Sequence, residues 1–248
     1  MLNRFRNLFF VFIIAFCSLY FFSCGQKDKN NDDTVNQNPA PPDEPDPTII
    51  PKFINTNHIE LDKISRISKF RSAAGHDYSD DYEHCRNMKH YYASYDSLDW
   101  STIKIFSPIN GTVSTIFDEW AGTQVQINSD QHKNFTVIIF HVILLKPLKV
   151  GDKLVAGQQL GTHYGSQTSS DIAVFQTIPN HPNYDLRKMI SYFDLMTDSL
   201  FQKYQQRGIT SRSDLIITKE ERDANPLTCN AGGFFTPSEN EADWVILK

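Results

Sequence analysis

Hydrophobic and polar positions between residues 103 and 162 predict short strands joined by tight turns. IKIFSPINGTVSTIF (103–117) has apolar runs on either side of an Asn-Gly pair, which is typical of a β-hairpin. TQVQI (123–127) alternates, and FTVIIFHVILL (135–145) is a continuous apolar run after the polar turn NSDQHKN. LKVGDKLVAGQQLGT (148–162) adds short apolar pieces around two glycine turns. We therefore expect a mainly β fold, an antiparallel sheet or a two-layer β domain.

After residue 180 the apolar period changes to that of a helix. Gly208 can end such a helix, and Thr218 with Glu221 forms a capping-box pattern for a second one. We therefore expect a β domain over 52–180 and a helical C-terminal extension over 181–248 that packs on it. The residues at helical spacing are Leu186, Met189, Ile190, Phe193, Met196, Leu200, Phe201 and Tyr204.

The N-terminal segment has the pattern of a targeting signal. MLNRFRNLFFVFIIAFCSLYFFSCG places two arginines before an uncharged apolar run, which predicts a secretory signal peptide over 1–23, with an uncleaved membrane anchor as the alternative. Ser23-Cys24 resembles the lipobox of bacterial lipoproteins, which implies that Cys24 is lipidated and holds the protein on a membrane. Residues 24–51 are polar and then proline-rich, as in a disordered tether. We expect an exported lipoprotein on the periplasmic or cell-surface side of the envelope, with the outer membrane favoured.

Charge argues against one class of partner. The chain has 24 Lys and Arg residues against 29 Asp and Glu, a net charge of −5. Removal of Arg4 and Arg6 with the signal peptide would make it −7. The sequence contains no basic patch and no aromatic residues interleaved with Lys or Arg, so we expect no binding to nucleic acid.

Cysteine usage predicts one disulfide. Cys17 would leave with the signal peptide and Cys24 would carry lipid, so Cys85 and Cys229 remain. Export to an oxidising compartment favours a bond between these two residues, and two buried thiols are the alternative. The bond would close a long loop and tie the C-terminal segment to the front of the domain.

Four motifs follow one another between residues 107 and 177: SPINGTV, the strand pair 123–127 and 135–140, FHVIL with His141, and LKVGDKLVAGQQLG. This order resembles the lysostaphin-like (LytM-type) zinc endopeptidases that cut peptidoglycan cross-bridges. The resemblance implies a LytM-like β domain and a peptidoglycan partner. The last motif is also similar to lipoyl and biotinyl carrier domains, but Lys133 is the one candidate for modification and it lacks the methionine neighbours of such carriers.

The same resemblance implies a metal site. GHDYSD supplies the H-x-x-x-D ligands of the family as His76 and Asp80, and His141 matches a catalytic histidine. A catalytic zinc site uses three protein ligands and a water molecule. The segment between this motif and the first strand is longer than the family pattern, and it carries His84 and His90, which are more typical of polar surface than of ligands.

The third ligand departs from the family pattern. Where the family has H-x-H, this chain has SSDIAVFQ, which places either Asp171 and Ala173 or Ile172 and Val174 at the two histidine positions. Asp171 is the candidate substitute, and a site made of His76, Asp80 and Asp171 would suit a harder metal than zinc. His163, eight residues earlier, is a further candidate.

Two functions follow from these residues. The first is a degenerate LytM-type domain that holds zinc or another divalent metal weakly, if at all, and binds peptidoglycan or an envelope protein without cleaving it. The alternative is an active metallo-endopeptidase, a peptidoglycan hydrolase with a rearranged metal site. In either case we expect His76, Asp80, His141 and Asp171 to converge in one cleft.

Overall fold

The computed structural model describes residues 50–179 and 185–248. The predicted signal peptide, the lipidation of Cys24 and nearly all of the tether fall on residues 1–49, outside the described residues. Among the residues described, no helix is long and apolar enough to span a membrane.

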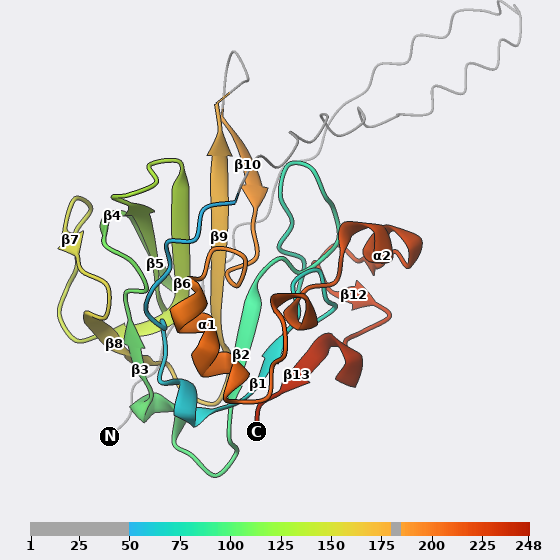
Figure 1. The fold of residues 1–248 in the computed structure, drawn as a ribbon, viewed down its shortest axis with the longest axis horizontal. Helices are drawn as coiled ribbons and strands as arrows, with labels where there is room; N and C mark the ends of the chain where they lie inside the picture. The colour runs from blue at the N-terminus through green and yellow to red at the C-terminus, as the bar shows by residue number, and fades with distance from the viewer. Residues whose placement is uncertain (1–49, 180–184) are drawn as a thin grey trace, which may run out of the picture. The chain divides into compact units, whose positions relative to one another are not determined.

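The described residues form a large antiparallel sheet and a two-stranded one, which confirms the expected mainly β fold (Figure 1). The path through the large sheet is β13-β1-β2-β9-β6-β5-β4-β7; β10 pairs with β9, and β8 pairs with β3 and β6. The strands are β1 (Ile64–Ser68), β2 (His90–Ser94), β3 (Lys104–Phe106), β4 (Gly111–Glu119), β5 (Gly122–Ser129), β6 (Phe135–Leu144), β7 (Lys153–Leu154), β8 (Gln159–His163), β9 (Ser170–Ile178), β10 (Leu186–Met189), β11 (Thr228–Cys229), β12 (Phe235–Thr236) and β13 (Trp244–Ile246).

Helices are short. In the part of the chain that the structure describes, the α-helices are α1 (Asp198–Gln205) and α2 (Lys219–Ala224), and the 3₁₀ turns are η1 (Leu61–Lys63), η2 (Trp100–Thr102), η3 (Arg212–Leu215) and η4 (Glu241–Asp243). The capping box predicted at Thr218 and Glu221 is present at the start of α2. This box satisfies backbone N–H groups that have no partner within the helix.

The predicted helix over residues 186–204 is wrong for its first half. Leu186–Met189 is instead strand β10, paired with β9, and only α1 is helical. Between them, the carbonyl of Leu195 accepts hydrogen bonds from Phe53 and Ile54, and Arg212 donates to two further carbonyls. Tertiary hydrogen bonds therefore replace the helical ones, and β10 and β13 make the C-terminal region part of the main sheet.

The predicted hairpin over residues 103–117 is also wrong, because β3 pairs with β8 and β4 pairs with β5 and β7. Gly111 opens β4 where a side chain would meet the carbonyl oxygen of Asn128 at 2.5 Å. The glycine thus serves close strand approach rather than a turn. The pair formed by β5 and β6, and the glycine turns at Gly151 and Gly157, agree with the sequence pattern.

Strand β9 lies between β2 and β6 and separates two apolar clusters. Ile172 and Val174 belong to the main core, together with Leu200, Phe201 and Tyr204 of α1. Ala173 and Phe175 belong to a second cluster with Phe70, Met88, Ile138, Phe140 and Met189. Because side chains alternate along a strand, Asp171 lies on the second face with Ala173.

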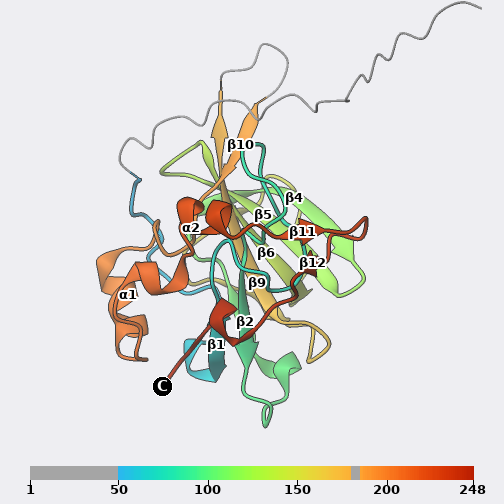
Figure 2. The same ribbon diagram turned by 90° about the vertical axis from the view of Figure 1, so that its right-hand side faces the viewer.

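Different segments cover the two faces. Figures 1 and 2 show α1 on one side of the sheet and β11 with β12 on the other. The structure confirms the predicted disulfide, with the Cα atoms of Cys85 and Cys229 5.7 Å apart and a sequence separation of 144. The bond ties β11 to the segment 71–88, which packs on the second face through residues such as Tyr78.

Candidate functional site

Four charged side chains form a row on the second face of the sheet. Asp171 has no exposed surface, and its Oδ2 lies 2.5 Å from the Nζ of Lys89, whose side chain is 3% exposed. The other oxygen of Asp171 lies 3.1 Å from the Nε2 of His141. The Nδ1 of His141 lies 3.4 Å from the Oε2 of Glu119. The row therefore alternates cation, anion, imidazole and anion from the interior toward the surface.

Strand pairing places Lys89 beside Asp171. Asp171 is the register partner of Tyr91 in β2, so these two side chains lie on the same face of the sheet. Lys89 precedes Tyr91 by two residues, and its side chain therefore lies on that face as well. The side-chain amide of Asn87 holds the backbone of Lys89: its Nδ2 donates to the carbonyl of Lys89, and its Oδ1 accepts from the Lys89 N–H. Asn87 thus fixes the backbone from which the Lys89 side chain extends toward Asp171.

A β-bulge directs His141. Thr123 and Val125 of β5 pair with Val142 and Ile139 of β6, so two residues of β6 lie opposite one residue of β5. His141 is in this bulge with a φ of 61°, a left-handed conformation that side chains rarely adopt. Its Nδ1 also lies 3.2 Å from the carbonyl oxygen of Ala121, in the turn between β4 and β5. Both ring nitrogens therefore have partners.

Opposite charges outweigh burial in this row. Burial alone would lower the pKa of His141, but the hydrogen bond to Asp171 and the charges of Asp171 and Glu119 raise it above its ordinary value. Burial would raise the pKa of Asp171, but Lys89 and His141 lower it. Burial would lower the pKa of Lys89, but chiefly the charge of Asp171 raises it. Glu119 differs, because burial raises its pKa by more than the charge of His141 lowers it. The Lys89–Asp171 pair is thus charged at neutral pH.

Aromatic rings surround the ammonium of Lys89. Its Nζ lies 4.4 Å from the ring centre of Phe140, 4.8 Å from that of Tyr91 and 4.9 Å from that of Tyr78. Cation–π attraction operates at these separations. Burial raises the pKa of Tyr91 to about 12, so its hydroxyl is protonated at neutral pH.

His76 lies at the border of this cluster. A side chain at the preceding Gly75 would collide with the Tyr91 ring and hydroxyl, so the loop rests directly on that tyrosine. The ring Nδ1 of His76 is 2.9 Å from the carbonyl oxygen of Asp77. Burial lowers the pKa of His76, and the charges of Lys89 and Asp171 act on it in opposite directions. The structure therefore places the loop of His76 against Tyr91, within range of the charges of Lys89 and Asp171.

Asp80 lies elsewhere. Its Oδ1 accepts hydrogen bonds from the N–H groups of Tyr82 and Glu83, and its Oδ2 accepts one from Met189 of β10. Met189 is the register partner of Phe175, four residues beyond Asp171 on β9, a separation of about 13 Å along a strand. The carboxylate thus joins its own loop to the β9–β10 hairpin.

The other candidate histidines differ from one another. His84 is exposed, as expected. His90 is buried, contrary to the expected polar surface, and its ring contacts the carbonyl oxygen of Ser68 and the hydroxyl of Ser191. His163 pairs with Val142, a main-core residue, so its side chain lies on the face away from Asp171.

The residues present do not fit the zinc site that the sequence resemblance implies. Such a site needs three nitrogen, sulfur or oxygen ligands around one point. Within residues 50–179 and 185–248, no group of three or more His, Cys, Asp or Glu side chains is arranged to hold a metal ion. Asp80 is bound to backbone amides, Ala173 carries no donor atom, and Asp171 already contacts a cation.

An aromatic rim lies at the outer end of the row. Trp120, in the turn between β4 and β5, is 69% exposed. Its ring centre is 6.3 Å from that of His141 and 6.1 Å from that of Tyr164. An exposed tryptophan beside a partly exposed imidazole and carboxylate is suited to contact a ligand with both apolar and polar groups.

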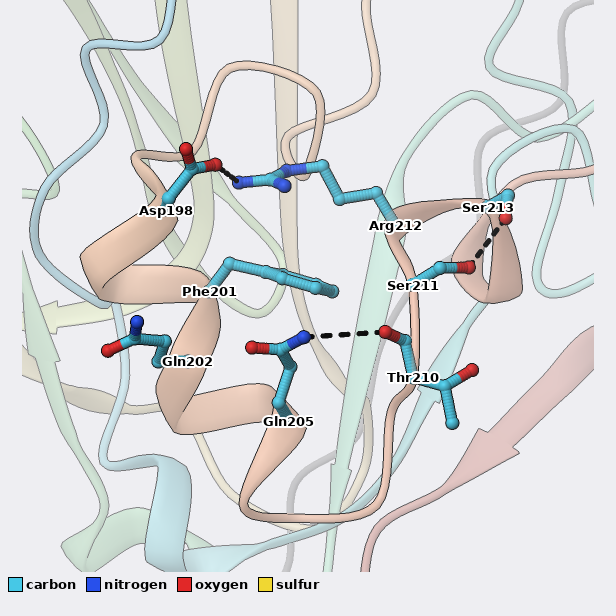
Figure 3. A pocket seen from close by; sticks show the side chains of 8 residues that line it. All are labelled: Asp198, Phe201, Gln202, Gln205, Thr210, Ser211, Arg212 and Ser213. Atoms are coloured by element: carbon cyan, nitrogen blue, oxygen red, sulfur yellow. Dashed lines mark hydrogen bonds and ion pairs between the residues drawn. The ribbon is translucent and has the colours of Figure 1, made fainter.

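A separate groove of about 460 Å³ lies beside α1. Figure 3 shows its polar side chains turned toward one another: Arg212 donates to Asp198, and Gln205 donates to the carbonyl of Thr210. The hydroxyls of Ser211 and Ser213 are 2.6 Å apart. Because these polar groups bind one another, they stabilise the connection between α1 and η3. Lys89, Asp171, His141 and Glu119 do not line this groove.

Lys89, Tyr91 and Glu119 were not among the residues expected from the sequence. A lysine before a short strand gives no sign of burial in a single sequence. One signal is their spacing: Lys89 and Tyr91 are two residues apart, so in an extended chain they lie on the same side. Asp171 is distant from both in the sequence and comes close to them only through the pairing of β2 with β9.

No protein-family model matches the chain, and no curated protein matches it. Among solved structures, the chain is similar to a mutant form of the catalytic domain of the prophage-encoded M23 protein EnpA from Enterococcus faecalis, with 18% identity, a TM-score of 0.35, and coverage of 55% of this chain and 93% of that one. The solution structure of lysostaphin is similar with 14% identity, a TM-score of 0.30, and coverage of 69% of this chain and 64% of that one. The SpoIIQ–SpoIIIAH pore-forming complex is similar with 12% identity, a TM-score of 0.38, and coverage of 64% of this chain and 99% of that one. These values are too low to assign the chain to a family.

Proposed function

We propose that this protein is an exported lipoprotein, anchored through Cys24, with a degenerate LytM-type domain that binds peptidoglycan or an envelope protein without cleaving it. The order of motifs between residues 107 and 177 supports the LytM-type relationship. The apolar N-terminal run ending at Ser23-Cys24 supports the anchor.

The observation that carries the proposal is the use of Asp80. In the family pattern this carboxylate is a metal ligand, whereas here both of its oxygens accept backbone N–H groups from two segments of the chain. Freeing it would leave three amides without their partners, which is costly in a part-buried position. Without a held metal ion, a metallopeptidase has no activated water.

The aromatic rim suggests where a ligand binds. Trp120 and Tyr164 flank His141, and Glu119 adds a hydrogen-bond acceptor at the same border. Sugar and peptide units of peptidoglycan carry both apolar faces and polar groups, which such a rim can contact.

Sedimentation of the purified full chain with insoluble peptidoglycan tests this function. We expect the protein to pellet with peptidoglycan, no soluble fragments to be released, and W120A to weaken binding by about tenfold, the size of a typical interface anchor. Phe234→Ala is the matched control, because Phe234 is 60% exposed but is not part of the rim. Equal binding by wild type and W120A would contradict the assignment of the rim.

A rearranged metallo-endopeptidase is the second candidate. It is favoured by His141, whose ring is oriented by Asp171 and by the Glu119 turn, and whose carboxylate partners favour the protonated form that a general acid would need. This candidate predicts zinc-dependent release of soluble fragments that D171A abolishes. Release of that kind would replace the non-hydrolytic proposal.

The anchor has its own test. Cys24→Ala should release the protein from the membrane fraction or leave it as unprocessed precursor. Cys17→Ser is the control, because Cys17 lies within the predicted signal peptide. Normal processing and membrane retention of the Cys24 variant would show that the protein is held by other means.

A further inference from the structure

A second groove lies on the face of the sheet that carries the charged row. It has a volume of about 420 Å³, and its lining comes from β4, β5, β6, β9 and β10 and from the turn after β5. These strands are neighbours (Figure 1), so the groove crosses four strand spacings, roughly 19 Å. We call it the polar trough, after the hydroxyl and carboxamide side chains in its lining: Ser114, Thr115, Gln126, Asn128, Thr136 and Thr177.

Much of the hydrogen-bonding capacity of the polar trough is unused within the protein. In the described part of the chain, the side chains of Thr115, Gln126 and Thr177 have no hydrogen-bond partner. Asn128 has one: its Oδ1 accepts from the hydroxyl of Thr136 at 2.9 Å, which leaves its amino group for another acceptor. Hydroxyl and carboxamide groups both donate and accept, so the trough suits a ligand whose own groups do both.

The charges of the polar trough nearly cancel. Asp185 lines it together with Lys133 and Arg187, and Lys133 already lies 3.7 Å from Asp130. The guanidinium carbon of Arg187 lies over the ring of Phe175, 4.9 Å from its centre, so a flat polar group is held at one end of the trough. A site with little net charge complements a neutral ligand better than an ion.

An exposed aromatic ring extends the polar trough toward the charged row. Phe117 is 54% exposed and pairs with Gln124. Two residues before it, Thr115 of the trough pairs with Gln126. Because side chains alternate along a strand, Thr115, Phe117 and Glu119 lie on one face of β4, each about 7 Å from the next. Phe117 therefore lies between the trough and the aromatic rim, where its ring can contact the apolar face of a ligand.

The direction of the polar trough favours a sugar chain over a peptide. Because the trough crosses the strands, it offers side chains and no row of free backbone N–H and C=O groups. An extended peptide has a backbone donor and acceptor at each residue and binds along a sheet edge, where the ladder can continue. An N-acetylated sugar chain has hydroxyls, amides and apolar ring faces without net charge. These groups match the trough and Phe117.

We propose that the polar trough and Phe117 bind a neutral, N-acetylated oligosaccharide chain. The chain crosses the strands, and its hydroxyl and amide groups bind Gln126, Asn128 and Thr177. One sugar ring lies on Phe117, and Arg187 donates to hydroxyl oxygens at the other end. The proposal deepens the proposed function and rests on it for the natural ligand, because it assigns the glycan part of peptidoglycan to this trough. Binding of a free oligosaccharide does not depend on that function.

Calorimetric titration of the purified full chain with a soluble N-acetylglucosamine hexasaccharide tests the site. We expect saturable binding, and Q126A, R187A and F117A should each weaken it by about tenfold, the size of a typical interface anchor. The backbone N–H of Arg187 binds Asp81, and R187A keeps this hydrogen bond, so the variant should fold. A tenfold increase in salt concentration should change the Kd by less than about twofold, because the ligand is neutral.

Arg66→Ala is the matched control. Arg66 also lies over an aromatic ring, 4.3 Å from the ring centre of Trp244, but it is on β1 and does not line the polar trough. This variant should bind the hexasaccharide as the wild type does. The proposal is overturned if the hexasaccharide does not bind, or if Q126A and R187A bind it as tightly as the wild type.

A second probe and the peptidoglycan assay separate the remaining outcomes. Salt-sensitive, Arg187-dependent binding of an N-acetylated dipeptide with a free carboxylate, in place of the sugar, would make the trough an anion site and overturn the proposal. Binding of the hexasaccharide by a protein that does not pellet with peptidoglycan would refute the proposed function and support this site. Pelleting without hexasaccharide binding would refute the site and leave the proposed function in place.

Discussion

Strand β9 has an apolar side and a charged side, and the two sides treat buried ionisable groups differently. On the main-core side, where Ile172 and Val174 pack, His58 and His90 are buried among aromatic rings. Burial lowers the pKa of His58 to about 3, outweighing the nearby charge of Asp171, and it lowers the pKa of His90 to about 4. Both rings are therefore neutral at neutral pH.

On the other side, Lys89 and Asp171 are as deeply buried and remain charged. The difference is the distance to an opposite charge, 2.5 Å within the pair. A buried group without such a partner gives up its charge, and a buried group with one keeps it. Full burial therefore does not by itself decide protonation. The charged side also carries His141 and Asp171, two of the residues singled out by the sequence resemblance.

Breaking the pair should have the largest effect. Asp171→Ala leaves the Lys89 ammonium buried without a partner, and we expect the free energy of unfolding to fall by about 3–5 kcal/mol. The matched control is Ile172→Val, the next residue on the opposite side of β9, which should cost about 0.5–1.5 kcal/mol. Urea denaturation measures both, and equal losses would mean that the two sides do not differ.

Opening the cover of the charged side should come next. Cys85 and Cys229 link the segment 71–88, which packs on the charged side through Tyr78, to β11. Cys85→Ala with Cys229→Ala should cost about 2–4 kcal/mol through the freed loop. Hydrogen exchange should increase in residues 71–88 more than in β5 and β6. Uniform loss of protection would contradict a role specific to the charged side.

The buried histidines of the apolar side should make the free energy of unfolding fall at acid pH. His58 has a folded pKa near 3 against about 6.5 in the unfolded chain, so the unfolded state binds the extra proton and stability falls as pH drops below 6.5. Removing the titration with His58→Phe should reduce the slope by up to about 1.4 kcal/mol per pH unit between pH 6 and 4. Ile172→Val, which removes no ionisable group, should leave the slope unchanged.

The sequence predicted local features better than long-range ones. Glycine turns and apolar runs gave the β5–β6 pair because those signals act within about ten residues. The hairpin at 103–117 and the first half of the helix at 186–204 were wrong, because Gly111 permits a close strand approach and β10 is held by pairing with β9. His141 and Asp171 were identified through family resemblance. Lys89 was not, since its burial depends on a strand that is distant in the sequence.

The smallest effect should be an alkaline limb from the charged side, opposite in sign to that of His58. The pKa of His141 is raised in the folded state, so this group stabilises the protein fully below pH 6.5, and that contribution is lost as pH rises through the folded pKa. We expect a loss of about 1 kcal/mol or less in the wild type above pH 6.5, because the imidazole is partly exposed and screened. His141→Gln should abolish this limb and preserve the acid limb. NMR titration of the His141 ring checks the cause directly: a pKa at or below 6.5 would mean that Asp171 and Glu119 do not hold the imidazolium, and that the row of charges ends at Asp171.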